Sequence, residues 1–294
     1  MNKVLSNRFA IFVFLGPALL LYTVILLIPI GWALGFTAFK GSPISGFEFA
    51  GFDNYIRLIG DKAVRDAFWF GLKYAAVVSG GQVLLGLILS LIYVFYLKSG
   101  TAWIRTLIFF PVVLPTVAVA QIFSKLFAIA PQYGLVNSLL AAIGLESFVQ
   151  AWLGQGDTAF WVIVIMDIWR AMGFYAILLY AGVIDIPTEL IEAARIDGAS
   201  DYQIARKVII PLLRPVLVSA IVFSLNGTLK VFDTILALTN GGPGTATSPL
   251  TVYFYKVAFS FSQYGYGSTI AVLLTLMSLV VTLLVLGLSR RAEY

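Results

Sequence analysis

The sequence predicts an all-α integral membrane protein that crosses the bilayer about six times. Of its 294 residues, 60% are hydrophobic and only 11% are charged. A soluble domain carries roughly 25% charged residues, so a surface this poor in charge must face hydrocarbon over much of its area. Six stretches stay apolar over about 20 residues, the length that a helix needs to cross a bilayer. We therefore expect one transmembrane domain over residues 1–294.

The expected helices run over residues 9–39, 69–97, 103–130, 159–184, 212–238 and 269–288. The first could be mistaken for a secretory signal, but its apolar core is longer than the 7–15 residues typical of such a signal, so we expect it to be retained. Pro111 and Pro115 lie inside the third stretch and Pro215 near the start of the fifth, where we expect kinks. The loop over residues 40–68 is expected to hold one or two short helices.

The loops set the expected orientation. Lys and Arg are more frequent in the segments on the N-terminal side of the membrane than in those on the opposite side. Because these residues gather on the cytoplasmic side, both termini are expected to be cytoplasmic. The net charge of +5 is explained in the same way, so the sequence gives no reason to expect binding to nucleic acid.

Two residue types and one motif are missing from the chain. It has no Cys, which excludes disulfides, and no His, which removes the commonest metal ligand and general base. No G-x-x-x-x-G-K-[ST] phosphate loop occurs in it. We therefore expect no catalytic site, no metal site and no cofactor on this chain, and any ATP-driven action would need a separate ATPase chain.

The connection over residues 185–211 differs from every other loop. Glu189 and Glu192 suit the first turns of a short helix, and Gly198 would end or bend that helix. A second short helix would follow, with apolar Ile204 opposite basic Arg206. Two amphipathic helices that meet at a glycine would form a compact cytoplasmic knob, suited to docking in a groove on a partner protein.

The spacing within this connection resembles the EAA loop of ABC-importer permeases, in which E-A-A is followed after three residues by G and after nine more by I-x-L-P. The matching residues are Glu192, Ala193, Ala194, Gly198 and Pro211. Val208 and Ile210 replace the Ile and Leu of the family and keep the apolar character. The resemblance implies that this loop docks on an ATPase subunit, with Glu192 as an anchor, the two alanines allowing close packing and Gly198 permitting the bend.

Other segments resemble the carbohydrate subfamily of these permeases, which imports oligosaccharides, polyols and glycerol phosphate. They lie at residues 49–55, 105–115 and 133–137, and at residues 232–233 followed by 238–243. The resemblance implies a multi-pass permease of the bacterial cytoplasmic membrane that moves a sugar by alternating access. Its implied partners are a second homologous permease subunit, two ATPase subunits that hold ATP and Mg, and an extracytoplasmic solute-binding protein.

Ionisable residues inside membrane helices usually face a cavity or one another. Asp167 and Arg170 are three residues apart in the fourth helix, so they could form a salt bridge or contact the solute. In the fifth helix, Asn226, Lys230 and Asp233 follow i, i+4, i+7 spacing and would form one polar stripe. That stripe could line the solute path or pack against the partner permease.

The resemblance also places the sugar site of the family on the two helices that flank the EAA loop, although its contacts cannot be matched residue by residue. Tyr175 could stack on a sugar ring, and Gly173 would let a ligand approach the backbone. The candidate residues of the solute path are Gly173, Tyr175, Asn226, Thr228, Lys230 and Asp233.

Three other functions stay open at this point. The chain could be an ABC permease for a solute that is not a carbohydrate, such as an amino acid, phosphate or a metal chelate. It could be an ion-coupled secondary transporter, which would need buried acidic residues near the bilayer centre and internal symmetry. A membrane-embedded enzyme would lack the usual catalytic groups, because the chain has no His, no Cys and no cluster of carboxylates within the membrane.

Overall fold

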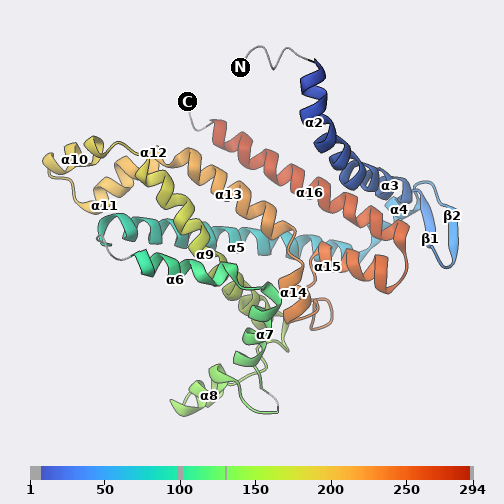
Figure 1. Ribbon diagram of the computed structural model, residues 1–294. Helices are drawn as coiled ribbons and strands as arrows, with labels where there is room; N and C mark the ends of the chain where they lie inside the picture. The colour runs from blue at the N-terminus through green and yellow to red at the C-terminus, as the bar shows by residue number, and fades with distance from the viewer. Residues whose placement is uncertain (1–7, 98–101, 130, 292–294) are drawn as a thin grey trace. The chain divides into compact units, whose positions relative to one another are not determined.

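The computed structural model describes residues 8–97, 102–129 and 131–291, and these residues are mostly helical (Figure 1). Within them, four helices are long and apolar enough to cross a membrane, and two bent helix pairs raise the number of possible spans to six. The predicted all-α membrane fold is therefore confirmed. Two compact units divide the chain: Met1–Val64 with Phe254–Leu273, and Arg65–Tyr253 with Leu274–Tyr294.

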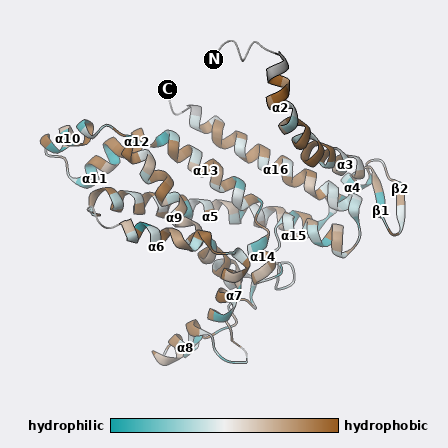
Figure 2. Cartoon of the chain, in the orientation of Figure 1, coloured by the Kyte–Doolittle hydropathy of each residue, from teal (hydrophilic) through white to brown (hydrophobic). Residues whose placement is uncertain are grey.

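The first unit begins with a long apolar helix, brown over much of its length in Figure 2. It consists of α2 (Arg8–Tyr22), a π-helical turn (Thr23–Leu27) and α3 (Ile28–Phe36). The π turn lies just before Pro29, a residue that cannot donate the usual backbone hydrogen bond. The helix ends at Phe36, and a β-hairpin of β1 (Phe39–Ser42) and β2 (Gly46–Phe49) follows it. The sequence predicted one or two short helices in the loop after the first span; α4 (Asp53–Gly60) is such a helix, and the hairpin before it was not predicted.

Besides Lys62–Val64, which begin the next long helix, three more helical segments belong wholly or partly to the first unit. They are α4 (Asp53–Gly60), the end of α15 (Leu250–Tyr255) with its π turn Lys256–Ser260, and the start of α16 (Tyr264–Arg291). The side chain of Asn54 in α4 donates hydrogen bonds to the carbonyls of Thr37 and Phe39, both at 2.8 Å. Arg57 donates to Gln263 at 2.8 Å, just before α16 begins. These bonds attach α4 to the ends of both α3 and α16.

The second unit holds the helices that line the candidate site, together with further helices, among them α6 (Ala102–Val113) and α8 (Leu135–Ala142). The lining helices are α5 (Lys62–Phe95), α7 (Thr116–Leu126), α9 (Gly156–Ile184), α13 (Arg214–Leu229) and α14 (Asp233–Leu238). Lys62–Val64 of α5 belong to the first unit. A single 3-10 turn, Glu146–Phe148, follows α8.

The span predicted over residues 103–130 is broken rather than kinked. α6 and α7 meet at an angle of 94°. Pro115 stands at the N-cap of α7, and a proline disfavours helical geometry in the residue before it, here Leu114. The sequence shows the proline, but it does not show whether neighbouring segments hold the helix together across it.

The span predicted over residues 212–238 is also discontinuous. Helical residues Asp201–Leu212 bend by 71° into α13 near Pro215, and α13 ends at Leu229. Residues 230–232 are not helical, and α14 starts at Asp233. The hydroxyl of Thr251 donates a hydrogen bond to the Val231 carbonyl, so one backbone group freed by the break is paired within the protein.

Two apolar clusters lie among the described residues of the second unit. One includes Tyr74, Val119, Phe160 and Ile163, and the other includes Leu179, Ile204, Ile209 and Leu213. The second cluster packs residues of the 185–211 connection against the membrane helices, so this connection is joined to the core of the unit.

At Gly173 the backbone of α9 lies close to the backbone of α6. A Cβ atom at this position would lie 2.1 Å from the carbonyl oxygen of Ile108 and 2.9 Å from the Cα of Phe109. Both are backbone atoms of α6, which cannot move aside as a flexible side chain can. Gly173 therefore lets two helix backbones pack closely, a use of small residues that is common in membranes.

We expect Gly173→Ala to destabilise the protein by about 1–3 kcal/mol or more, because the added methyl group overpacks the contact between α6 and α9. Thermal unfolding of the purified transporter measures this. Gly80→Ala is the matched control, since a Cβ on Gly80 would meet nothing within 4 Å. Equal melting temperatures of the two variants would show that the contact at Gly173 is not tight.

Candidate functional site

The connection over residues 185–211 folds into two helical pieces. α10 (Thr188–Ile196) is followed by α11 (Asp201–Ile204), a π turn (Ala205–Ile209) and α12 (Ile210–Leu212). α10 ends in a Schellman motif, in which Gly198 donates to the Arg195 carbonyl and Ala199 to the Ala194 carbonyl, both at 3.0 Å. This motif requires a left-handed residue, and Gly198 has a φ of +80°. The prediction that Gly198 ends the first short helix is therefore confirmed.

α11 begins with a capping box that the sequence analysis did not use. The Ser200 hydroxyl accepts a hydrogen bond from the Gln203 backbone, and the Gln203 side chain accepts one from the Ser200 backbone. The signal was available, because Ser-x-x-Gln before apolar residues is a known helix start. Ile204 and Ile209 then turn inward and are fully buried. The second half of the connection is thus held firmly against the core.

The first half of the connection is open to its surroundings. In this half Glu192, Ala193 and Gly198 are exposed and Ala194 is half-buried; Pro211, at the far end of the second half, is exposed as well. Three large apolar side chains in the same region are exposed as well: Leu190, Ile196 and Tyr202. An acidic residue among exposed apolar side chains makes a surface of the kind that marks protein interaction sites.

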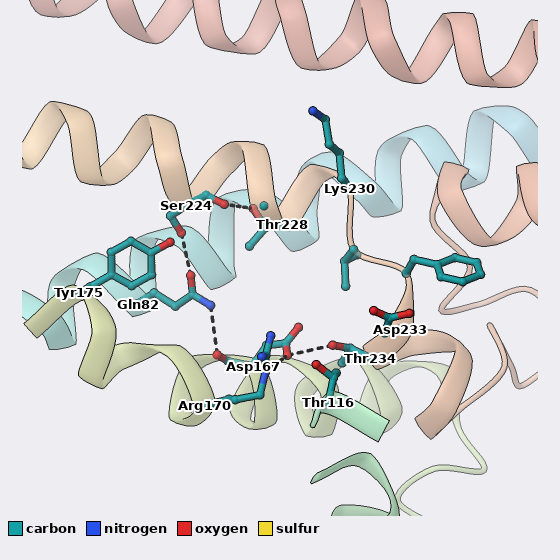
Figure 3. Close-up of a pocket in the computed structure, with 13 residues that line it drawn as sticks. Gln82, Thr116, Asp167, Arg170, Tyr175, Ser224, Thr228, Lys230, Asp233 and Thr234 are labelled. Carbon is teal, nitrogen blue, oxygen red and sulfur yellow. Dashed lines mark hydrogen bonds and ion pairs between the residues drawn. The ribbon is translucent and has the colours of Figure 1, made fainter. Parts of the chain in front are cut away.

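A cavity of about 250 Å³ lies between α5, α9, α13 and the broken segment that leads into α14. Polar side chains line most of it, and Figure 3 shows Gln82, Asp167 and Arg170 pointing toward one another, while the Lys230 side chain extends away from them. The labelled residues are Gln82, Thr116, Asp167, Arg170, Tyr175, Ser224, Thr228, Lys230, Asp233 and Thr234. A polar cavity among membrane helices is expensive to maintain, and such cavities usually serve a function.

Asp167 is the most constrained charged group in this cavity. Its carboxylate accepts hydrogen bonds from the Tyr74 hydroxyl of α5 and, at 3.0 Å, from the Thr234 hydroxyl of α14. The Nε atom of Arg170 lies 3.5 Å from the carboxylate, so the salt bridge expected from the i, i+3 spacing is present. One buried carboxylate therefore joins three separate elements, α5, α9 and α14.

Gln82 forms a second link within the same wall. Its amide nitrogen donates to the backbone carbonyl of Asp167 at 3.0 Å, and its amide oxygen accepts from the Ser224 hydroxyl at 2.7 Å. Thr228, one turn further along α13, makes a hydroxyl contact of 2.9 Å with Ser79 of α5. These bonds join α5 to both α9 and α13 without using a charged side chain.

Four candidate path residues line the cavity: Tyr175, Thr228, Lys230 and Asp233. Two do not. Gly173 faces the backbone of α6, and the Asn226 amide donates to Thr282 of α16 at 3.0 Å. The predicted stripe of Asn226, Lys230 and Asp233 is wrong, because α13 ends at Leu229 and the helical spacing does not continue past it.

Four residues of the site were not predicted from the sequence: Tyr74, Gln82, Ser224 and Thr234. Gln82, Ser224 and Tyr74 are uncharged polar or phenolic groups inside apolar stretches, and such groups often bond across membrane helices. That signal could have found them. Thr234 contacts Asp167 only because the chain breaks before α14, and the sequence pattern does not show this break.

A helical membrane protein with a polar cavity among its helices and a compact loop between two of them has the features of a transport permease. Residues 82–294 match the family described as binding-protein-dependent transport system inner membrane component. The chain belongs to this family. The resemblance to ABC-importer permeases is thereby confirmed.

Characterised relatives cover nearly the whole chain. The sulfoquinovosyl glycerol transport system permease protein SmoG of Agrobacterium fabrum is 32% identical, over 98% of this chain and 93% of the relative. The multiple sugar-binding transport system permease protein MsmF of Streptococcus mutans is 32% identical, over 99% of each chain. A crystal structure of a bacterial ABC transporter that imports the polysaccharide alginate has a chain with the same fold, with a TM-score of 0.84 and 23% identity over 98% of each chain.

We expect Gln82→Met to destabilise the protein by about 1–3 kcal/mol, because the Ser224 hydroxyl would stay buried without its acceptor. Thermal unfolding of the transporter measures this change. Adding Ser224→Ala should recover part of the loss, since the hydroxyl left unpaired is then removed. If the losses of stability of the two single variants simply add in the double variant, the hydrogen bond between these side chains contributes nothing to stability.

Proposed function

We propose that this permease carries a carbohydrate or related polyol across the cytoplasmic membrane, and that the cavity beside Asp167 lies on the path of the solute. The polar lining of this cavity is the observation that carries the proposal. Sugars present many hydroxyl groups, which need both donors and acceptors, and the cavity offers amide, hydroxyl, carboxylate and ammonium groups together.

The charges of the cavity suit an uncharged solute. Asp167 and Arg170 pair with each other, and the cavity also holds one further group of each sign, Lys230 and Asp233. These last two side chains are exposed and form no ion pair with another residue in the described ranges. The lining therefore has no net formal charge. An anionic solute would find one free cation and one free carboxylate, which gives it little net attraction.

The size of the cavity limits what it can enclose. About 250 Å³ is below the roughly 300–1,000 Å³ of sites that enclose drug-sized ligands. A small sugar, or one end of a longer one, fits this limit better than a whole oligosaccharide. The half-buried ring of Phe232 adds an apolar face to the lining, which a sugar ring can stack against.

The names of the relatives support carbohydrate as the substrate class, although one relative, the alginate transporter, imports an acidic polysaccharide. Relatives with about a third of their residues identical to this chain are named for transport of a sulfoquinovosyl glycerol and of multiple sugars. In the alginate transporter, a further structure contains a periplasmic protein with a bound alginate pentasaccharide. By analogy, an extracytoplasmic solute-binding protein would deliver the solute to this permease and a second homologous permease would complete the pore.

We further propose that the connection over residues 185–211 docks on an ATPase subunit. Its exposed half presents Glu192 and the apolar Leu190 and Ile196, while its buried half packs in the cluster with Leu179 and Leu213 of the membrane helices. A push on the exposed half would therefore reach α9 and α13, which both line the cavity. ATP and Mg would be held by two ATPase subunits, and their closure would drive alternating access. Both termini would be cytoplasmic.

We expect Gly198→Val to abolish most solute uptake and solute-stimulated ATP hydrolysis, because a β-branched residue is strained at positive φ and would distort the docking loop. Transport and ATPase assays on the reconstituted transporter measure both. Gly144→Val is the matched control. Gly144 ends α8 in an equivalent Schellman motif with a φ of +78°, and a Cβ at either glycine meets nothing within 4 Å.

The comparison separates local strain from docking. If Gly144→Val lowers uptake as much as Gly198→Val, the loss reflects general strain and the docking role is unsupported. If only Gly198→Val uncouples ATP hydrolysis from uptake, the loop carries the coupling. Gly198→Asn should retain much of the coupling, since asparagine tolerates left-handed geometry better than valine does.

The solute path is tested at Asp233. We expect Asp233→Ala to reduce sugar uptake about tenfold or more, since a hydrogen bond to a charged group contributes about 1.5–3 kcal/mol. Asp157→Ala is the control: both residues are exposed carboxylates in the first turn of a helix, so both changes cost the same helix-dipole interaction. Asp157 is not in the lining of the cavity. Equal uptake by the two variants would show that Asp233 does not contact the solute on its path.

A further inference from the structure

α4, in the first unit, presents an apolar surface that the proposed transport function does not use. Phe52, Ile56 and Ile59 follow i, i+4, i+7 spacing and are 78%, 69% and 84% exposed. Asn54, on the opposite face of the helix, is only 1% exposed. The helix is therefore amphipathic with its apolar face turned outward, the reverse of a helix on a water-soluble domain.

The hairpin that precedes α4 has two unlike faces. Its register pairs Phe39 with Phe49 and Lys40 with Glu48. Because side chains alternate along a strand, Phe47 shares a face with Phe39 and Phe49, while Lys40 and Glu48 lie on the other face. One face is thus aromatic and the other is charged.

The aromatic face is continuous with the first apolar helix. The ring of Phe47 stacks on that of Phe36, the last residue of α3, with 5.1 Å between their centres. The tip of the hairpin carries Ile44, which is 93% exposed. Two backbone N–H groups of this tip, those of Ile44 and Ser45, donate hydrogen bonds to the Ser42 hydroxyl. They keep these partners when the tip leaves water and enters the membrane.

The hydrogen bonds of α4 fix its level relative to the membrane. Asn54 binds carbonyls at Thr37 and Phe39, directly after the first span ends, and Arg57 binds Gln263, directly before α16 begins. The ends of two apolar helices mark the place where the hydrocarbon gives way to lipid headgroups. α4 is therefore held at this boundary.

We propose that α4 and the β1–β2 hairpin form a lipid anchor that lies in the headgroup region of the leaflet opposite the N-terminus. Phe52, Ile56 and Ile59 would reach the upper acyl chains, as in amphipathic helices that lie in a membrane surface. The Phe rings of the hairpin have no polar group and would extend this apolar surface toward the acyl chains. The charged side of this segment faces water, where Lys40 and Asp53 form an exposed ion pair at 2.7 Å.

The chain has no cysteine, so an introduced cysteine is the one thiol of this subunit, and the transporter with the unaltered chain measures any label on its partners. The test places bimane on Ile56→Cys in the assembled transporter, reconstituted in phosphatidylcholine–phosphatidylglycerol vesicles. Glu48→Cys, on the charged face of the hairpin, is the matched control. Quenching by doxyl-labelled lipid should be about twofold or more stronger at position 56 than at position 48, and quenching by aqueous iodide should show the reverse order.

Two outcomes would overturn the proposal. Equal iodide quenching at both positions would place the apolar face of α4 in water. Protection of position 56 from both quenchers would show that protein covers this face, either the second permease or the solute-binding protein. Ile59→Cys serves as a second site, so that a label which disturbs the helix at one position does not decide the result.

Discussion

The buried carboxylate of Asp167 is the interaction on which the rest of the site depends. A charge among membrane helices is costly unless it is paired and hydrogen-bonded. Tyr74, Arg170 and Thr234 meet this need from α5, α9 and α14. Because they come from three elements, satisfying the charge also holds these elements around the cavity. The same interactions explain how a polar space can exist within an otherwise apolar bundle.

The break after Leu229 matters as much as the charge. A continuous helix would carry Lys230 and Asp233 on its own surface, at helical spacing. With the break, both side chains line the cavity while Asn226 turns to Thr282 of α16, and Thr234 comes within reach of Asp167. A broken membrane helix is tolerated where its freed backbone groups are paired or line a cavity, and Thr251 supplies one such pair.

These details show what the sequence could and could not predict. Hydropathy indicates the apolar helices because a segment that contacts lipid must consist mostly of apolar residues, and this is visible in the local sequence. Gly198 could be assigned to a bend because only a left-handed residue ends α10 in this way. The break at residues 230–232, the hairpin after Phe36 and the role of Gly173 were not predictable. Each depends on a contact with a distant segment: Thr251, α4 and the α6 backbone.

The central claim is that the solute passes through the cavity beside Asp167, and the reactivity of a cysteine in its wall tests this most directly. Lys230→Cys would be the single thiol of the permease, since the chain contains no other. The measurement is its rate of reaction with a membrane-impermeant maleimide in the reconstituted transporter, with and without a saturating transported sugar. The account predicts that the sugar slows this reaction and that a sugar which is not transported has no effect. A rate that transported sugars leave unchanged would contradict it.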